Sequence, residues 1–189
     1  MPAKMTVLSL AHTGHVLAAI AEPPSGPASL EALIGAAFPL RATRVRNGGG
    51  AFDASFALPA SLLKLKSIAY DARVIARPQS FAVNGDFAVE LPADDVPTVG
   101  GLSASAVTAD YGSAVAADTK VLVVVRDEID PRVQRIQAGA ILAGEQIADL
   151  NLTIVPDGPA ATLAAGTDCF VAVAVEGRLL GYSRESTPP

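Results

Sequence analysis

The sequence predicts a mainly β protein, either an antiparallel β-sandwich or two small β units built from hairpins, with one or two short helices. Apolar residues recur at every second position in several short runs, and turn residues such as Gly, Pro and Asn separate these runs. Half of the 189 residues are hydrophobic and only 17% are charged. A chain of this length and composition can bury a sizeable core without disulfides or metals.

The clearest local signal is a hairpin over Ser80–Leu91. Asn84 and Gly85 lie between two runs of alternating apolar residues. Asn-Gly tolerates the positive φ angles of a tight hairpin turn, whose twist matches that of the flanking strands. We expect Phe81 to lie on the same side of this hairpin as Phe87 or its neighbours.

Weaker hairpin signals lie near both ends of the chain. One covers residues 6–21 with a turn at Gly14, and the other covers residues 169–183 with a turn at Gly177. Glycine supplies the positive φ that such turns often need. Both ends of the protein are therefore predicted to form sheet.

Further strands follow from the hydrophobic pattern. Residues 51–58, 68–77 and 150–154 alternate between apolar and other residues, which is typical of strands with one wet face. The last of these runs leads into a turn predicted at residues 156–159. Residues 120–126 form a continuous apolar run between charges, as expected of a strand covered on both faces. Either a second layer of the sandwich or another chain would bury the second face of this strand.

Evidence for helix is confined to two segments. Ser29–Gly35 begins with a capping serine and ends with a glycine, which predicts a helix of barely two turns. Residues 131–142 fit either a helix or a strand.

The composition changes over residues 92–109, which are rich in Pro, Gly, Ser and Ala. This segment is predicted to be a linker or a long loop between a hairpin-rich unit (1–91) and a C-terminal β unit (110–189). A single sandwich formed by residues 1–189 is the alternative, and the sequence leaves both open.

Charge is divided unevenly between the two halves. Residues 1–91 hold eight Lys and Arg against six Asp and Glu, a net charge of +2. Residues 92–189 hold six against thirteen, a net charge of −7, and the two sum to the −5 of the whole chain. Opposite charges on the two halves would favour a head-to-tail contact between copies. The acidic total argues against a nucleic-acid partner, which requires a concentrated basic face.

His12 and His15 are the only candidates for a metal site. A two-residue turn between them would place the two imidazoles ~5 Å apart on one face, as half of a metal site. No further ligand follows at motif spacing, because these are the only histidines and Cys169 lies in a distant apolar run. The favoured interpretation is therefore an exposed hairpin tip, with no metal bound.

Other catalytic patterns are missing from the sequence. The acidic cluster Arg126–Arg132 lacks the spacing of a calcium loop and is interpreted as a solvated turn. No nucleophile elbow occurs. Asn47–Gly50 lacks the Lys-Ser/Thr of a phosphate-binding loop and is interpreted as a loose turn between two strands. Cys169 is interpreted as a small packed hydrophobe. We therefore expect no catalytic residue, no cofactor and no enzymatic activity.

These observations favour an assembly subunit, which forms a homo-oligomer or part of a ring, tube, tail-like structure or shell. Its partners would be itself or other subunits of the assembly. The alternative is a β-sandwich adaptor module that binds a different protein, and a small enzyme or metal-binding protein is a third class. No secretory leader and no membrane span is recognised, so a cytoplasmic location is expected.

Overall fold

The computed structural model describes residues 4–22, 29–35, 37–45, 51–152 and 162–189. The described chain is mainly β, which confirms the predicted fold class. The strands are β1 (Lys4–Leu10), β2 (Val16–Ala21), β3 (Ala37–Val45), β4 (Ala51–Pro59), β5 (Leu63–Ala69), β6 (Phe81–Asn84), β7 (Phe87–Glu90), β8 (Thr98–Leu102), β9 (Ala106–Asp110), β10 (Thr119–Asp127), β11 (Gln134–Ile141), β12 (Ile147–Asn151), β13 (Asp168–Val175) and β14 (Gly181–Ser186). The helices are α1 (Leu30–Ile34) and α2 (Ala72–Ala76), with short 3-10 turns at Ala60–Leu62 and Pro78–Ser80.

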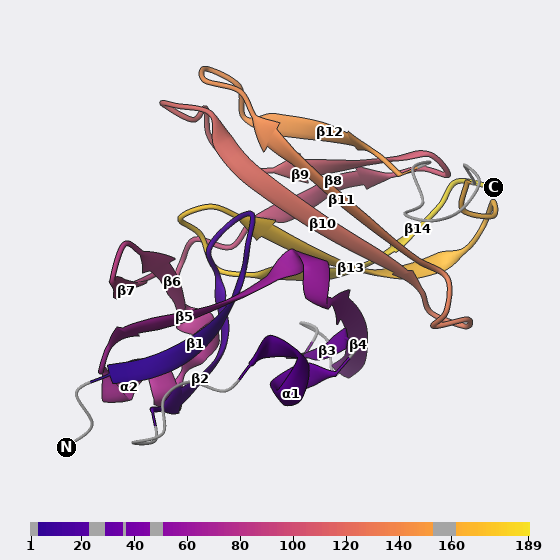
Figure 1. The fold of residues 1–189 in the computed structure, drawn as a ribbon. Coiled ribbons are helices and arrows are strands. Elements are labelled where there is room, and N and C mark those ends of the chain that lie inside the picture. Colours follow the sequence, from indigo (N-terminus) through magenta and orange to yellow (C-terminus); the bar gives the residue numbers. More distant parts are fainter. Residues whose placement is uncertain (1–3, 23–28, 36, 46–50, 153–161) are drawn as a thin grey trace.

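The strands form antiparallel sheets joined mostly by hairpins. The largest has the order β11-β10-β13-β14, and a sheet of order β12-β9-β8 packs against one of its faces. A sheet of order β2-β1-β5 and the hairpin β3-β4 pack against the opposite face. Figure 1 shows the resulting layers, with the four-stranded sheet between the others. The hairpin β6-β7 forms a further small sheet.

Side chains of β10 alternate between two cores. Val121, Val123 and Val125 pack in the core shared with β8, β9 and β12. Leu122 and Val124 pack in a second core, shared with β1, β3 and β4. The predicted strand over 120–126 is thus confirmed, and its second cover comes from the N-terminal part of the same chain.

The sheet β2-β1-β5 is also covered on both faces. Leu8 and Leu10 of β1 point into the core shared with β10 and β13. Met5 and Val7 point the other way, into a third core that includes Val74 of α2 and Phe81 of β6. Alternation along a single strand therefore connects successive layers of the structure.

The hairpin predicted over Ser80–Leu91 is present, but its turn is shifted by one residue. Asn84 pairs with Phe87, so the two connecting residues are Gly85, with φ +54°, and Asp86. Phe81 pairs with Glu90 and Val83 pairs with Ala88, so Ala88 lies on the side of Phe81 and Phe87 lies on the opposite side. Phe81 is fully buried, whereas Phe87 is 65% exposed.

Both terminal hairpins are confirmed as β1–β2 and β13–β14. Each has a connection longer than a two-residue turn, formed by residues 11–15 and 176–180 respectively. Gly14 and Gly177 have φ of 79° and 81°, which places the glycines at the bends as predicted. The extra residues of these two connections bring the hairpin ends against each other.

The strand predicted over Ile68–Arg77 is wrong beyond Ala69, where β5 ends. The side chain of Asp71 accepts a hydrogen bond from the backbone N–H of Arg73 at 2.8 Å and caps α2. Capping satisfies a backbone donor at the helix start, and Val74 gains a fully buried position. A local cap and tertiary packing together override the alternating pattern.

Three other expectations can be compared with the structure. The helix predicted at Ser29–Gly35 is present as α1 and ends at Gly35, with φ +62°. The ambiguous segment 131–142 contains strand β11. Residues 92–109 are not merely a linker or loop, because they contain β8 and most of β9. The division into two units stays a prediction, and the turn predicted at 156–159 lies outside the described residues.

A central strand covered on both faces makes a testable prediction. Leu122→Ala should lower the free energy of unfolding by about 2–5 kcal/mol, because it leaves a cavity in the core shared with β1. Val123→Ala should also destabilise, by less, through the other core. Urea unfolding measures both, with Val89→Ala (48% exposed) as the control. A Leu122→Ala protein as stable as this control would contradict burial of that face.

Candidate functional site

The two histidines lie in the β1–β2 connection but do not face each other. His15 is fully buried, and its ring nitrogens lie 2.8 Å from Thr13 Oγ1 and 2.7 Å from the carbonyl oxygen of Arg178. His12 is partly buried, with Nε2 3.0 Å from the carbonyl oxygen of Gly139. The exposed-tip interpretation is wrong for His15, because the longer connection folds it inward.

Hydrogen bonding fixes the form of the His15 ring. A carbonyl oxygen only accepts, so Nε2 donates to Arg178, and Nδ1 accepts from the hydroxyl of Thr13. Burial lowers the pKa of His15, while the carbonyl of Arg178 and the charge of Glu176 act in the opposite direction. His15 is therefore neutral near pH 7 and links the two terminal hairpins.

This use of both ring nitrogens bears on the metal hypothesis. His15 has no nitrogen left for a metal ion in this arrangement. In the part of the chain that the structure describes, no group of three or more His, Cys, Asp or Glu side chains is placed to hold a metal ion. The junction around His15 is suited to holding the hairpins together.

Arg178 completes this junction from the β13–β14 connection. Its guanidinium lies 3.8 Å from the centre of the Tyr111 ring and forms an ion pair with Asp95. The backbone carbonyl of Asp95 also accepts a hydrogen bond from Leu179 at 3.1 Å. Burial lowers the pKa of Arg178, whose side chain is only 14% exposed. One arginine therefore connects the N-terminal hairpin to the segment before β8 and to the end of β9.

A polar pocket of about 200 Å³ opens beside His12. Lys64, Lys66 and Lys120 line it, together with Glu176. Lys66 Nζ donates to the carbonyl of Gly85 at 2.6 Å, and Lys120 lies 4.0 Å from Glu176. The pocket is basic, but two of its three lysines already have partners within the chain.

The acidic segment between β10 and β11 forms a hydrogen-bonded turn. Asp127 Oδ1 accepts from the backbone N–H of Ile129 at 2.7 Å and of Asp130 at 3.0 Å. The side-chain hydrogen bond from Arg132 holds the pKa of Asp130 below its usual value. Glu128 instead pairs with Arg184. These carboxylates are directed to their own turn and to arginines, as the solvated-turn interpretation expects.

Cys169 is fully buried in the core between the two C-terminal sheets. Burial, with smaller contributions from nearby carboxylates, raises the pKa of its thiol to about 11. The thiol is therefore protonated at neutral pH and is a poor nucleophile.

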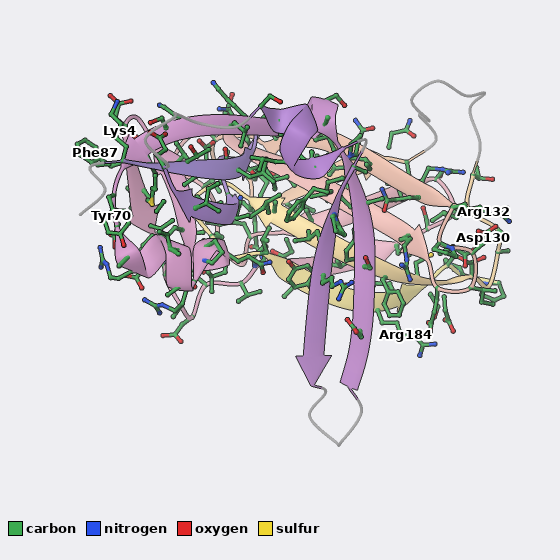
Figure 2. The ribbon with its side chains drawn as sticks, turned by 60° about the horizontal axis from the view of Figure 1, so that its bottom comes forward. Lys4, Tyr70, Phe87, Asp130, Arg132 and Arg184 are labelled. Atoms are coloured by element: carbon green, nitrogen blue, oxygen red, sulfur yellow. The ribbon has the colours of Figure 1, made fainter. Side chains whose placement is uncertain are left out.

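Strands β3 and β4 form an arm, defined as residues 37–45 and 51–59. Figure 2 shows the arm extending away from the rest of the molecule as two paired strands. Its root is anchored by Leu40, Phe56 and Leu58, which are buried, and the Phe56 ring stacks 6.4 Å from that of Tyr182.

The two long edges of the arm differ. The side-chain amide of Gln134 bonds both the N–H and the carbonyl of Ala57, at 3.0 and 2.7 Å, and Arg126 donates to the carbonyl of Ser55. These side chains therefore satisfy backbone groups on the outer edge of β4. Pro39 pairs with Ala57 and therefore turns its ring nitrogen outward on β3, where a missing N–H breaks no ladder bond. Within the described residues, no strand pairs with the outer edge of β3.

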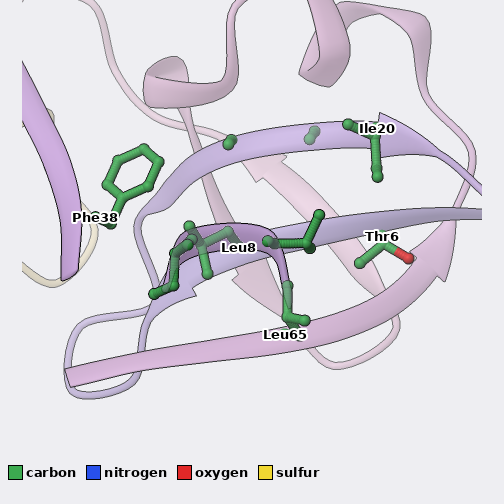
Figure 3. Close-up of a pocket in the computed structure, with 9 residues that line it drawn as sticks. Thr6, Leu8, Ile20, Phe38 and Leu65 are labelled. Carbon is green, nitrogen blue, oxygen red and sulfur yellow. The ribbon is translucent and has the colours of Figure 1, made fainter. Parts of the chain in front are cut away.

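An apolar groove lies between the sheet β2-β1-β5 and α1. We define it by its main lining residues, Leu8, Ile20, Leu33, Phe38 and Leu65, and call it the α1 groove. Figure 3 shows these side chains around the hollow. Its volume is about 130 Å³, and both Ile20 and Leu33 are 44% exposed. The groove is thus an apolar surface that the described residues leave open.

Sequence patterns indicated the two strands of the arm but did not reveal the α1 groove. The alternation of residues 51–58 predicted one strand, and the turn predicted at residues 47–50, which lies outside the described residues, implied another strand before it. The projection of the arm does not follow from periodicity. The groove combines β1, β2, β5, α1 and β3, and no local signal joins these elements. Comparison of the chain with protein-family models, with curated proteins and with solved structures gave no significant match. No helix in the described ranges is long and apolar enough to cross a membrane.

Burial of neutral His15 predicts a pH-dependent stability. The unfolded chain binds a proton at His15 below pH ~6.5, whereas the folded chain resists it, so stability falls as the pH drops below that value. One proton contributes at most about 1.4 kcal/mol per pH unit.

Urea unfolding between pH 5 and pH 7.5 measures this slope. His15→Gln should flatten the slope over this range, and His12→Gln serves as the matched control that retains it. Equal slopes for the wild type and His15→Gln would show that another group titrates.

Proposed function

We propose that this chain is a non-enzymatic structural subunit that assembles with copies of itself, alone or within a larger particle in the cytoplasm. The observation that carries the proposal is the β3-β4 arm. Its strands extend beyond the body while the outer edge of β3 stays open among the described residues. An open edge is a template for pairing with another chain, and proteins normally keep such edges short or covered. Pro39 offers no N–H on this edge, so pairing would use the residues of β3 beyond it.

Exposed apolar side chains support the same proposal. Ile20 and Leu33 line the α1 groove, Phe87 and Val89 lie on one strand, and Ile129 is 90% exposed. Single exposed apolar residues are common on monomers, but adjacent ones mark contact surfaces more often. The apolar richness of the whole chain adds little, because the run in β10 is buried inside this same chain.

The native mass tests this proposal directly. We expect light scattering on a sizing column to give a discrete multiple of 19.2 kDa. A monomer that persists at high concentration would contradict self-assembly and would direct attention to a different protein partner.

Shortening the arm tests the observation that carries the proposal. Replacing residues 43–53 with Asn-Gly should dissociate the oligomer, while Ala42 and Ala54, which are buried and paired, retain the root of the arm. The unfolding free energy of the shortened protein should stay within about 1 kcal/mol, because the buried residues at the root of the arm are kept.

A matched control keeps both strands and replaces only residues 46–50 with a Gly-Ser segment of equal length. This control should assemble normally. An oligomer that survives removal of residues 43–53 would show that the arm is not the contact.

A further inference from the structure

We propose that the polar pocket beside His12 binds a small phosphate-bearing anion, either free phosphate or the phosphate group of a small ester. We call it the lysine pocket and define it by its charged lining residues, Lys64, Lys66, Lys120 and Glu176. Its volume is about 200 Å³. The site goes beyond the proposed function and does not require assembly.

Strand pairing explains why three lysines meet at this pocket. Lys64 and Lys66 lie two residues apart on β5, so their side chains lie on the same face of that strand. Ser9 of β1 pairs with Lys64 and lines the pocket on this side. Lys120 comes from the start of β10, in the four-stranded sheet. Lysines from two different sheets therefore share one hollow, in a chain whose net charge is −5.

The charge of the lysine pocket is not balanced by its own lining. Glu176 supplies the one carboxylate among the described lining residues, so three lysines against one glutamate leave a charge of +2. Glu176 lies 4.0 Å from Lys120, which is beyond hydrogen-bond distance. Lys66 lies 3.4 Å from Asp86, but the Asp86 side chain is 84% exposed. Exposed ion pairs of this kind contribute little to stability, so an anion can compete for both lysines.

Hydrogen-bond donors at the pocket remain without acceptors. The Lys64 ammonium forms no hydrogen bond or ion pair with any described residue. An ammonium carries three donors, and Lys66 uses one of them for the carbonyl of Gly85. The backbone N–H groups of His12 and Thr13, in the connection that lines the pocket, also bond to no described residue. Unpaired backbone N–H groups beside positive charges are typical of anion sites.

The composition and size of the pocket favour a phosphate group. Lysine binds phosphate as a point charge, whereas a planar carboxylate is matched best by arginine, and none of the described lining residues is an arginine. A phosphate ester carries a charge of about −1.5 to −2 at neutral pH, which complements the lining. A cavity of about 150 Å³ holds a six-carbon ring, so the lysine pocket has room for phosphate with a short organic chain.

Isothermal titration calorimetry of the full chain tests the site, with inorganic phosphate or ethyl phosphate as the probe and chloride replaced at constant ionic strength. We expect one site per chain. Lys64→Gln should weaken binding about 10-fold or more, through loss of a charged donor. Its ammonium has no partner among the described residues, so the fold should be unaffected. Lys4→Gln is the matched control, because Lys4 is also exposed on the same sheet but does not line the pocket.

Glu176→Gln should change the affinity in the opposite direction. Removing the one carboxylate among the described lining residues should tighten phosphate binding about threefold or more, because a repulsive charge is lost. Damage to the fold would not strengthen binding. Phosphate should also raise the thermal unfolding midpoint of the wild type, since only the folded chain brings the lysines of both sheets together.

The outcomes separate the phosphate site from the proposed function. A dissociation constant above about 10 mM for both probes would overturn the site, and so would equal weakening by Lys4→Gln, which would reveal a general attraction to positive charge. Tighter binding of ethyl phosphate would assign the site to esters, and tighter binding of inorganic phosphate would assign it to the free anion. A monomeric chain that binds phosphate would contradict the proposed function and leave this site standing.

Discussion

The structure depends on the pair of strands β10 and β13, which are apolar on both faces. Strand β10 sends alternate side chains into two different cores, and β13 does the same with Val171 on one face and Ala172 on the other. A strand of this kind is stable only when layers cover both sides, since exposing either face would leave a row of valine or leucine side chains in water. The N-terminal sheet and the β12-β9-β8 sheet are therefore held by a common layer.

A polar junction complements this apolar layer at one end of the sheets. His15 and Arg178 connect the two terminal hairpins through one short hydrogen bond, and Arg178 extends the connection to Asp95 and Tyr111. Buried polar groups are costly without partners, so this junction accepts few alternative arrangements. Its chemistry explains why two histidines near each other in sequence bond to different backbone carbonyls and do not face each other.

Three features of the described residues are not explained by this architecture. The arm is anchored by Phe56 and Leu58 at its root, but the outer edge of β3 pairs with no other described strand. Ile129 is 90% exposed, and the α1 groove is an apolar hollow with partly exposed lining residues. Stability within the chain does not explain these features, and the proposed assembly is one way to account for them.

Local patterns in the sequence predicted most of the strands, the helix at Ser29–Gly35 and several turns, because side-chain period and glycine positions are properties of neighbouring residues. They did not predict β8 and β9, and they extended the strand of β5 into the residues of α2. The continuous apolar run over residues 120–126 also predicted a strand that is buried on both faces. The sheets that bury each face of β10 are known from the tertiary structure alone. Periodicity indicates the face on which a side chain lies, but it does not indicate which element packs against that face. The tertiary structure likewise decided that residues 72–76 form a helix, that His15 is buried, and that the arm projects. Each of these outcomes depends on contacts between residues far apart in the chain, which no local pattern contains.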